Sequence, residues 1–598
     1  MSQSPASRRR FISNFVGVGL SSALLPAALR AQSAAPAVVP AAAPAPAAGP
    51  ITALMLKDAA RIAGHSFTEE ECAGIVSNAN QNLARYKKLH AISIPDRVAP
   101  PFYFNPLVPG MTVNRTRAPF KPSATLKVKR PANLEDVAYW PVTQLAGLIK
   151  SRAVTSLELT DMYLARLKRL NAKLNCVVTF LDDIAHAEAK RADAEIAAGN
   201  YKGPLHGIPW GCKDIIAVKG YKTTWGSDAF KDQVIDADAS VVEQLREAGA
   251  VLIAKLTTGE LAGGDQWFGG RTNNPWKLDQ GASGSSAGPG SATGGGCVGF
   301  SIGTETGGSI LSPSARCGVT GLRPTFGRVS RHGAMTLSWT QDRLGPMCRS
   351  VEDCALVMAA ISKPDGRDLS VQDVPFNWNA RFDWKKLRVG YLKTAFDEST
   401  ARYPDWMKAE QETLAKLEAL GAKLVPIVIP DNYGDATSVS VEASVFFDEF
   451  FRSGRDKLLT RKTRSTGFRA SRFIPAIEYM QAQRVRAMMM QDLAKATEGV
   501  DVYLAPAAGS NVRAEGPAAE AAAAAGGGAQ TPQNLTAQHS RMANIACYPG
   551  LALPNGFSAD GTPTSILFMA RPFGETELLA VAKAYQDATD HHSKHPVL

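Results

Sequence analysis

Paired cysteines and clustered metal ligands are missing from this 598-residue sequence. Its eight cysteines stand singly, and no two of them have the Cys-x-x-Cys spacing of zinc or redox sites. Most have small apolar neighbours, which predicts buried and unreactive thiols. A Cys212 nucleophile would need a base such as His206, but Pro209 lies between the two and excludes a helical pairing. We therefore expect no metal, no cofactor and no thiol chemistry.

Signals for nucleic-acid binding are scarce too, although the net charge is +11 from 66 basic and 55 acidic residues. No basic run carries interleaved aromatic residues. The densest basic cluster, residues 461–472, is typical of the solvated face of a helix or loop. With 45% apolar and 20% charged residues, the composition is that of a globular protein. The sequence predicts no nucleic-acid partner.

The N-terminus has the features of an export signal. Three arginines at 8–10 precede an apolar stretch at 15–29, which is shorter than the ~20 residues needed to span a bilayer. Paired arginines in this position indicate the twin-arginine route, so residues 1–31 are predicted to be a signal peptide. Residues 32–50 are almost only alanine and proline, which is typical of an extended linker. We expect a periplasmic or secreted protein with no stable membrane anchor after processing.

Two regions are predicted beyond the linker. Residues 51–135 contain helical stretches at 51–63 and 68–90 and then a proline-rich extended segment. Residues 136–598 alternate short strands with helices, which favours an α/β fold whose sheet is covered on both faces. Residues 514–530 are of low complexity and are interpreted as an insertion in this second region.

Particular elements can be placed within the α/β region. Thr155 and Glu158 form a capping box at the start of a helix, and Asp238 is expected to cap another. The expected strands lie at 250–255, 387–391, 424–428, 502–504 and 565–569, and a final helix at 575–586.

The most informative stretch is rich in glycine. Eleven of the 28 residues at 281–308 are glycine, which allows close backbone approach and positive φ angles. The stretch contains Ser285 and Ser286 and ends at Ser309, and a lone lysine, Lys213, lies upstream in an apolar run. Two serines, a lysine and a series of backbone N–H donors are the parts of an acyl-transfer site that needs no histidine.

These motifs resemble those of the amidase signature family. The family pattern of a glycine-serine cluster followed by G-[ST]-[DE]-x-GGS stands here as residues 284–288 and 303–309, with the expected 24-residue separation between Ser285 and Ser309. The lysine motif at 207–214 and further matches at 317–330, 345–353, 544–554 and 571–573 extend the resemblance over about residues 136–590. It implies a single mixed β-sheet covered on both faces by α-helices, to which residues 51–135 add a helical extension.

The resemblance also implies a role for each site residue. Ser309 would be the nucleophile, and Ser285, after a cis peptide bond, would relay its proton to Lys213. Lys213 must be neutral to act as a base, and its apolar flanks would lower its pKa by desolvation. The oxyanion would be held by backbone N–H groups of Thr306, Gly307, Gly308 and Ser309, with Ser286 supporting the network through hydrogen bonds.

Two positions depart from the family pattern. The usual aspartate before the oxyanion loop is Glu305, and the usual arginine two residues after the nucleophile is Leu311. Arg316 is a candidate to replace that arginine. Taken alone, Lys213 would be interpreted as a surface lysine or as the partner of Asp214.

Several alternatives remain open at this point. Residues 284–288 also fit the G-x-S-x-G nucleophile elbow of α/β-hydrolases, but a polar segment precedes them where that elbow needs a buried strand. Within the amidase signature family, the expected activity is hydrolysis of a small-molecule amide. The alternatives are an esterase, a carbamate hydrolase, the A-type component of the amidotransferase that amidates mischarged transfer RNA, or a catalytically inactive binding protein. The sequence leaves homodimer formation open.

Overall fold

The computed structural model describes residues 49–92, 116–402, 404–429, 433, 441–507 and 535–598. The signal peptide, nearly all of the linker and the low-complexity insertion predicted above lie outside these residues. Contacts divide the chain into two units, residues 1–51 and residues 52–598, and the elements below all belong to the second. Among the described residues, no helix is both long and apolar enough to cross a membrane.

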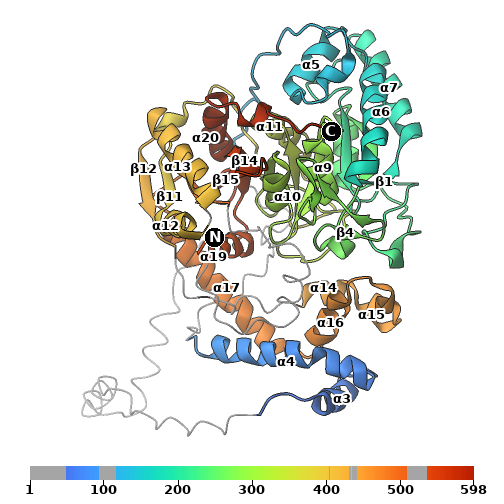
Figure 1. The fold of residues 1–598 in the computed structure, drawn as a ribbon, viewed down its shortest axis with the longest axis vertical. Coiled ribbons are helices and arrows are strands. Elements are labelled where there is room, and N and C mark those ends of the chain that lie inside the picture. Colours follow the sequence, from blue (N-terminus) through green and yellow to red (C-terminus); the bar gives the residue numbers. More distant parts are fainter. Residues whose placement is uncertain (1–48, 93–115, 403, 430–432, 434–440, 508–534) are drawn as a thin grey trace, which may run out of the picture. The chain divides into compact units, whose positions relative to one another are not determined.

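One mixed sheet of 11 strands forms the framework of the second unit. Its order is β1-β3-β2-β8-β10-β9-β14-β15-β13-β11-β12, with parallel pairs at β3-β2-β8 and at β13-β11-β12. The two edge strands, β1 and β12, lie on opposite sides of the view in Figure 1. The strands are β1 (Val177–Phe180), β2 (Pro209–Lys213), β3 (Val251–Leu256), β8 (Phe300–Glu305), β9 (Thr320–Arg323), β10 (Arg343–Cys348), β11 (Val389–Leu392), β12 (Leu424–Ile427), β13 (Val502–Pro506), β14 (Gly550–Phe557) and β15 (Pro563–Ala570). Two small hairpins stand apart from the sheet: β4 (Gln266–Trp267) with β5 (Gly270–Arg271), and β6 (Asn273–Asn274) with β7 (Lys277–Gly281).

Helices cover both faces of this sheet, as the sequence predicted. Those of the α/β region are α5 (Val142–Lys150), α6 (Ser156–Leu174), α7 (Asp182–Ala197), α8 (Ser240–Glu247), α9 (Ala287–Gly294), α10 (Leu311–Cys317), α11 (Val351–Ile361), α12 (Lys393–Arg402), α13 (Pro404–Ala419), α19 (Leu535–Ile545) and α20 (Glu575–Asp587). The expected capping box at Thr155 opens α6. Asp238 caps nothing: Ala239 precedes α8, and the Asp238 carboxylate instead accepts the Lys219 N–H and pairs with Arg246.

Further helices precede the α/β region or interrupt it. They are α3 (Ala53–Ile62), α4 (Glu69–His90), α14 (Glu442–Phe446), α15 (Asp448–Arg452), α16 (Lys462–Ser471) and α17 (Ala476–Ala496). α4 packs against α16 and α17. The expectation that residues 461–472 form a solvated basic face is wrong for Arg469, because this side chain is nearly buried between Glu71 at 2.9 Å and Asp456 at 2.7 Å.

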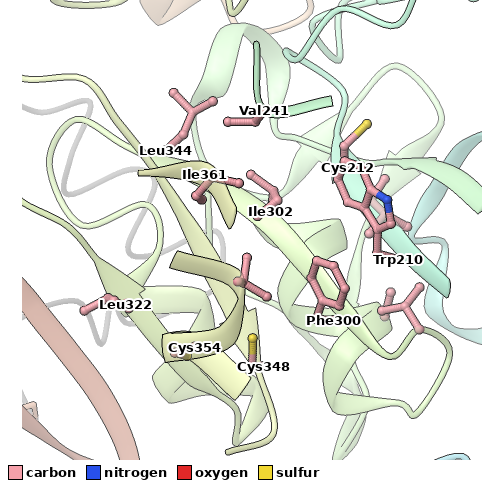
Figure 2. Packing of buried hydrophobic residues seen from close by; sticks show 14 of the residues in the cluster. Trp210, Cys212, Val241, Phe300, Ile302, Leu322, Leu344, Cys348, Cys354 and Ile361 are labelled. Carbon is pink, nitrogen blue, oxygen red and sulfur yellow. The ribbon is translucent and has the colours of Figure 1, made fainter. Parts of the chain in front are cut away.

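The main hydrophobic core includes side chains of β2 and of β8, a strand within the glycine-rich region. Trp210 of β2 stacks on Phe300 of β8 with 5.8 Å between ring centroids, and Cys212 lies in the same buried cluster (Figure 2). Side chains alternate between the two faces of a strand, so Lys213 lies on the face opposite to Trp210 and Cys212. All eight cysteines are buried and free, as their apolar surroundings predicted.

Candidate active site

Neighbouring strands bring the site residues together. β2 and β8 are parallel partners in the sheet, so their carboxyl ends meet at the same edge. Lys213 is the last residue of β2, and the turn from Thr306 to Ser309 follows β8 directly. Ser285 lies just before α9, which packs against β8. Residues that are far apart in the sequence therefore converge at this edge.

Lys213 is fully buried and hydrogen-bonded to hydroxyl groups. Its Nζ donates to Ser285 Oγ at 2.8 Å and to Thr304 Oγ1 at 2.8 Å. The neighbouring carboxylate of Asp214 pairs instead with Lys255, 2.8 Å away. The alternative in which Asp214 neutralises Lys213 is therefore wrong. Burial lowers the pKa of Lys213 to about 7, although the carboxylates of Asp342 and Glu305 oppose this shift.

Ser285 and Ser286 are held by close backbone packing. The peptide bond between Gly284 and Ser285 is cis, as expected from the resemblance. A Cβ on Gly284 would lie 2.0 Å from the carbonyl oxygen of Gly264, so only glycine fits here. Ser286 Oγ donates to the Thr304 carbonyl and accepts from the Thr304 N–H, both at 3.1 Å, which ties the start of α9 to β8.

Ser309 is fixed to this network through its backbone. The Ser286 N–H donates to the Ser309 carbonyl at 3.1 Å, which places the half-buried Ser309 beside the two serines of the motif. Although both residues lie in the described part of the chain, the Ser285 and Ser309 hydroxyls are not hydrogen-bonded to each other there. The structure thus joins Lys213 directly to Ser285, and joins Ser309 to the pair through Ser286.

The turn before Ser309 presents free N–H groups. Within the described residues, no hydrogen bond uses the backbone N–H of Gly307, Gly308 or Ser309. Gly308 has a φ of 108°, which residues with a Cβ rarely adopt, and Gly307 is exposed. Neighbouring N–H donors without intramolecular partners are suited to hold a negatively charged oxygen.

The Glu305 carboxylate organises the other end of this turn. It is fully buried, and Oε2 accepts the N–H groups of Ile310 at 2.8 Å and Leu311 at 3.0 Å. Burial opposes ionisation of Glu305, but the guanidinium groups of Arg323 and Arg343 outweigh it and lower the pKa of this carboxyl.

The guanidinium bonded to Glu305 is not the expected one. Arg323 Nη1 lies 2.8 Å from Glu305 Oε1, whereas Arg316 donates to Gln280 at 3.1 Å. Arg316 therefore does not replace the arginine missing at Leu311. Arg323 lies on β9, inside a motif that the resemblance already covered, but no sequence signal indicated that its side chain would cross to β8.

A cavity adjoins the hydroxyl partner of Lys213. It has both polar and apolar walls, and its lining residues are Ile215, Ala262, Thr304, Thr306, Arg331, Ala334, Met335, Thr336, Leu337, Asp342 and Leu344. Thr304 and Thr306 flank Glu305 on β8 and in the following turn, so the cavity reaches the same strand end as Lys213.

The rival bases and nucleophiles lie elsewhere. His206 precedes β2, at the opposite end of the strand from Lys213, and its buried Nε2 lies 3.0 Å from Glu195. The strand before the G-x-S-x-G segment is β7, which belongs to a two-stranded hairpin and not to the main sheet, so the nucleophile-elbow architecture is absent. In the described part of the chain, no three His, Cys, Asp or Glu side chains are grouped so that they could hold a metal ion.

Both the sequence and the fold of this chain are similar to those of known proteins. The model of the family described as Amidase matches residues 158–579, more than two thirds of the sequence. The chain belongs to the amidase family. It is accordingly a family enzyme that acts on C–N bonds.

Individual relatives agree with this assignment. The A-type component of glutamyl-tRNA(Gln) amidotransferase from Geobacter metallireducens is 34% identical over 490 residues, covering 76% of this chain and 98% of the relative. The solved structure of a peptide amidase in complex with the competitive inhibitor chymostatin has a TM-score of 0.66 and 28% identity, covering 77% of this chain and all of that chain. An amidase family protein from Bacillus anthracis also has a TM-score of 0.66, with 25% identity, covering 78% of this chain and 93% of that chain.

Proposed function

We propose that this protein hydrolyses the C–N bond of a small-molecule carboxamide through an acyl-enzyme on Ser309. The observation that carries the proposal is the buried hydrogen bond of 2.8 Å from Lys213 to Ser285, at a lysine whose pKa is lowered to about 7. A lysine with this pKa is substantially neutral at physiological pH and can accept a proton. The peptide amidase relative, named for acting on an amide, is similar over its whole chain.

In the proposed mechanism, Lys213 is the base and Ser285 the proton relay. Ser309 Oγ attacks the substrate carbonyl while its proton passes to Ser285, whose own proton passes to Lys213. The C–N bond then breaks as the proton returns by the same route to the leaving nitrogen, and a water molecule releases the acyl group from Ser309. This route requires the Ser285 and Ser309 hydroxyls to come within hydrogen-bond reach when the substrate is bound, since catalytic hydrogen bonds often tighten only in that complex.

The oxyanion of each tetrahedral intermediate would be held by backbone N–H groups of Thr306, Gly307 and Gly308. The backbone N–H group of Ser309 is adjacent to these donors. One donor of this kind lowers the barrier by about 3 kcal/mol. Ser286 supports the arrangement by tying β8 to the residues around Ser309.

Ser309→Ala tests the nucleophile. The variant is expected to lose hydrolysis of every accepted substrate while remaining folded. Ser314→Ala is the matched control, because the buried Ser314 hydroxyl on α10 has no hydrogen-bond partner among the described residues and lies outside the proposed machinery. Activity above a few per cent in Ser309→Ala would reject the assignment and make Ser286 the next candidate nucleophile.

A screen of acceptors and leaving groups separates the related activities. Amides, esters and carbamates all fit the same acyl-enzyme chemistry, and amides are the expected class. The amidotransferase role is the second candidate, because a relative bearing that name matches over 98% of its length. Ammonia release from a simple carboxamide with water as the only acceptor supports the hydrolase. Turnover only of glutamine, and only with an added acceptor, favours the amidotransferase role.

We further propose that the protein is exported by the twin-arginine route. The support for this proposal is the pair Arg8 and Arg9, which precedes a weakly apolar stretch. The mature chain would begin near Gln32. Replacing both arginines by lysine and fractionating the cells tests this. Retention of the unprocessed double variant in the cytoplasm is expected, and unchanged processing and location would reject the route.

A further inference from the structure

Thr306, the residue between Glu305 and the glycine pair, is held by Arg343, the first residue of β10, and by Asp342, which directly precedes that strand. Its Oγ1 donates to Asp342 Oδ1 at 2.5 Å, and its carbonyl oxygen accepts from Arg343 Nη2 at 3.0 Å. Arg343 begins β10 and lies opposite Glu305 in the antiparallel pair with β8. The hydroxyl and the carbonyl of one loop residue are therefore both anchored at the edge of the sheet.

The second contact fixes the direction of an oxyanion donor. The carbonyl of Thr306 and the N–H of Gly307 belong to one planar peptide unit, and in a trans unit they point in opposite directions. A guanidinium that holds the carbonyl on the β10 side therefore turns the Gly307 N–H away from β10. Gly307 is exposed, and within the described residues its N–H has no hydrogen-bond partner.

Both anchors are themselves held by further hydrogen bonds. The second carboxylate oxygen of Asp342 accepts the N–H groups of Leu337 at 2.7 Å and Ser338 at 2.8 Å. Arg343 is 2% exposed, and its Nη2 also donates to Asn544 Oδ1 at 2.9 Å. Two consecutive glycines have little conformational preference of their own, so a loop containing them depends on such external contacts.

Within the described residues, the Arg343 guanidinium is hydrogen-bonded only to Thr306 and to Asn544, and it lies close enough to Glu305 to lower the pKa of that carboxyl. Within the described residues it forms no ion pair, because Glu305 is bonded to Arg323, and its Nε and Nη1 have no hydrogen-bond partner. A buried guanidinium without a carboxylate partner is costly to stability. Such costs are typical of residues kept for function.

We propose that Asp342 and Arg343 are positioning residues that clamp Thr306 and thereby hold the Gly307 N–H in the direction of the developing oxyanion. This rests on the proposed function of Ser309. The clamp acts through the Thr306–Gly307 peptide, by fixing the direction of its N–H group. It supplies a donor that is oriented before the reaction begins, which is the property that makes oxyanion sites effective.

Substitutions at Thr306 and Arg343 test the clamp. Thr306→Val removes the hydroxyl donated to Asp342 but keeps the shape, Thr306→Ser keeps the hydroxyl, and Arg343→Gln removes the guanidinium. Because a misdirected donor acts in the transition state, Thr306→Val and Arg343→Gln should lower kcat about 10- to 100-fold, with KM changed less than about twofold. Thr306→Ser should recover most of the kcat that Thr306→Val loses, because it keeps the hydroxyl that Asp342 accepts. Arg316→Gln is the matched arginine control, since Arg316 donates to Gln280 and not to the loop.

A second readout compares two inhibitors. A trifluoromethyl ketone that forms a tetrahedral adduct should bind more weakly to Thr306→Val by the same factor as kcat/KM falls, whereas an unreactive substrate-like ketone should bind as before. Thr306 is only half-buried, so this variant can be measured even if Arg343→Gln does not fold.

The outcomes separate the clamp from the proposed function. Unchanged kcat in Thr306→Val overturns the clamp. A fall in kcat/KM that comes only from a higher KM overturns it as well. In either case the nucleophile assignment stands if Ser309→Ala is inactive. Failure of the native protein to hydrolyse any amide, ester or carbamate, or hydrolysis that persists in Ser309→Ala, rejects the proposed function and the clamp with it.

Discussion

At the scale of single residues, Lys213 shows how burial prepares a base. Its ammonium would have no carboxylate partner, because Asp214 is bonded to Lys255, and its Nζ instead donates to two hydroxyl groups. Hydroxyl groups stabilise the charged form less than a carboxylate does, so desolvation dominates and lowers the pKa to about 7. The carboxylates of Asp342 and Glu305 accept hydrogen bonds from other donors and only moderate the shift.

The rate should therefore rise with pH through about 7 and then level off. Lys213 must lose its proton to act as base, so the active fraction grows as the pH passes the pKa of Lys213. The profile of kcat/KM against pH for a neutral amide measures this. Lys213→Ala should hydrolyse the amide much more slowly, and its kcat/KM should no longer rise with pH through about 7. The same rise in this variant would remove Lys213 from the mechanism.

The same residue should link stability to pH. The pKa of Lys213 lies near 7 in the folded chain and near 10.4 when unfolded, so between these values the unfolded chain binds one more proton. The free energy of unfolding should then rise with pH by about 1.4 kcal/mol per pH unit across that window, relative to Lys213→Met. Parallel unfolding curves of the two proteins at pH 7, 8.5 and 10 measure the difference. A constant difference would contradict a lowered pKa.

At the scale of elements, the ends of β8 and β9 are joined by the buried pair of Glu305 and Arg323. Both side chains are at most 1% exposed, and the same carboxylate accepts two N–H groups at the start of α10. A strand end, a strand and a helix therefore depend on one carboxylate.

Breaking this pair should be costly. Arg323→Met removes the ion-pair partner of the buried Glu305 carboxylate and should lower the free energy of unfolding by about 3–5 kcal/mol. Arg388→Met removes a pair in which Arg388 is 55% and Asp501 30% exposed, and should cost less than about 1 kcal/mol. Denaturant unfolding of both variants at pH 7 gives the comparison. Equal losses would show that the Glu305 pair carries no special weight.

The sequence predicted the elements well where local chemistry decides them. The capping box at Thr155, the strand at β3 and the final helix α20 all lie within one or two residues of expectation. It failed at Asp238, where a tertiary contact with Arg246 takes the side chain away from the helix start.

The candidate site, too, could be predicted from the sequence only in part. The glycine-serine spacing and Lys213 were readable from the sequence because they are local motifs with a fixed chemistry. The contacts of Arg323, Asp342 and Arg343 with the Glu305–Thr306 segment were not, since they depend on strand pairing between distant segments. The sequence showed only that Leu311 departs from the family pattern, which has an arginine at this position. That Arg323 pairs with Glu305 in place of that arginine was visible only in the structure.

At the scale of the whole chain, aromatic contacts and an ion pair attach the helices before the α/β region. Phe67 packs edge-on to Phe451 and Phe473 with 5.9 Å between ring centroids in each case, and Glu71 pairs with Arg469. These contacts join the start of α4 to the α15–α17 region.

Phe67→Ala should loosen this attachment without unfolding the sheet. Loss of this half-buried aromatic side chain removes its ring contacts with Phe451 and Phe473. Amide hydrogen exchange should accelerate in α3 and α4, and exchange in β8 and β9 should stay unchanged. Faster exchange in the sheet as well would show that the N-terminal helices and the sheet unfold as one unit.

Covalent labelling of the nucleophile tests the proposed mechanism most directly. The native protein is treated with a fluorophosphonate, digested, and the modified residue located by mass spectrometry. We predict one adduct, on Ser309, that forms much more slowly in Lys213→Ala and not at all in Ser309→Ala, whereas Ser314→Ala labels at the native rate. An adduct on Ser286, or labelling that persists in Ser309→Ala, would contradict the mechanism.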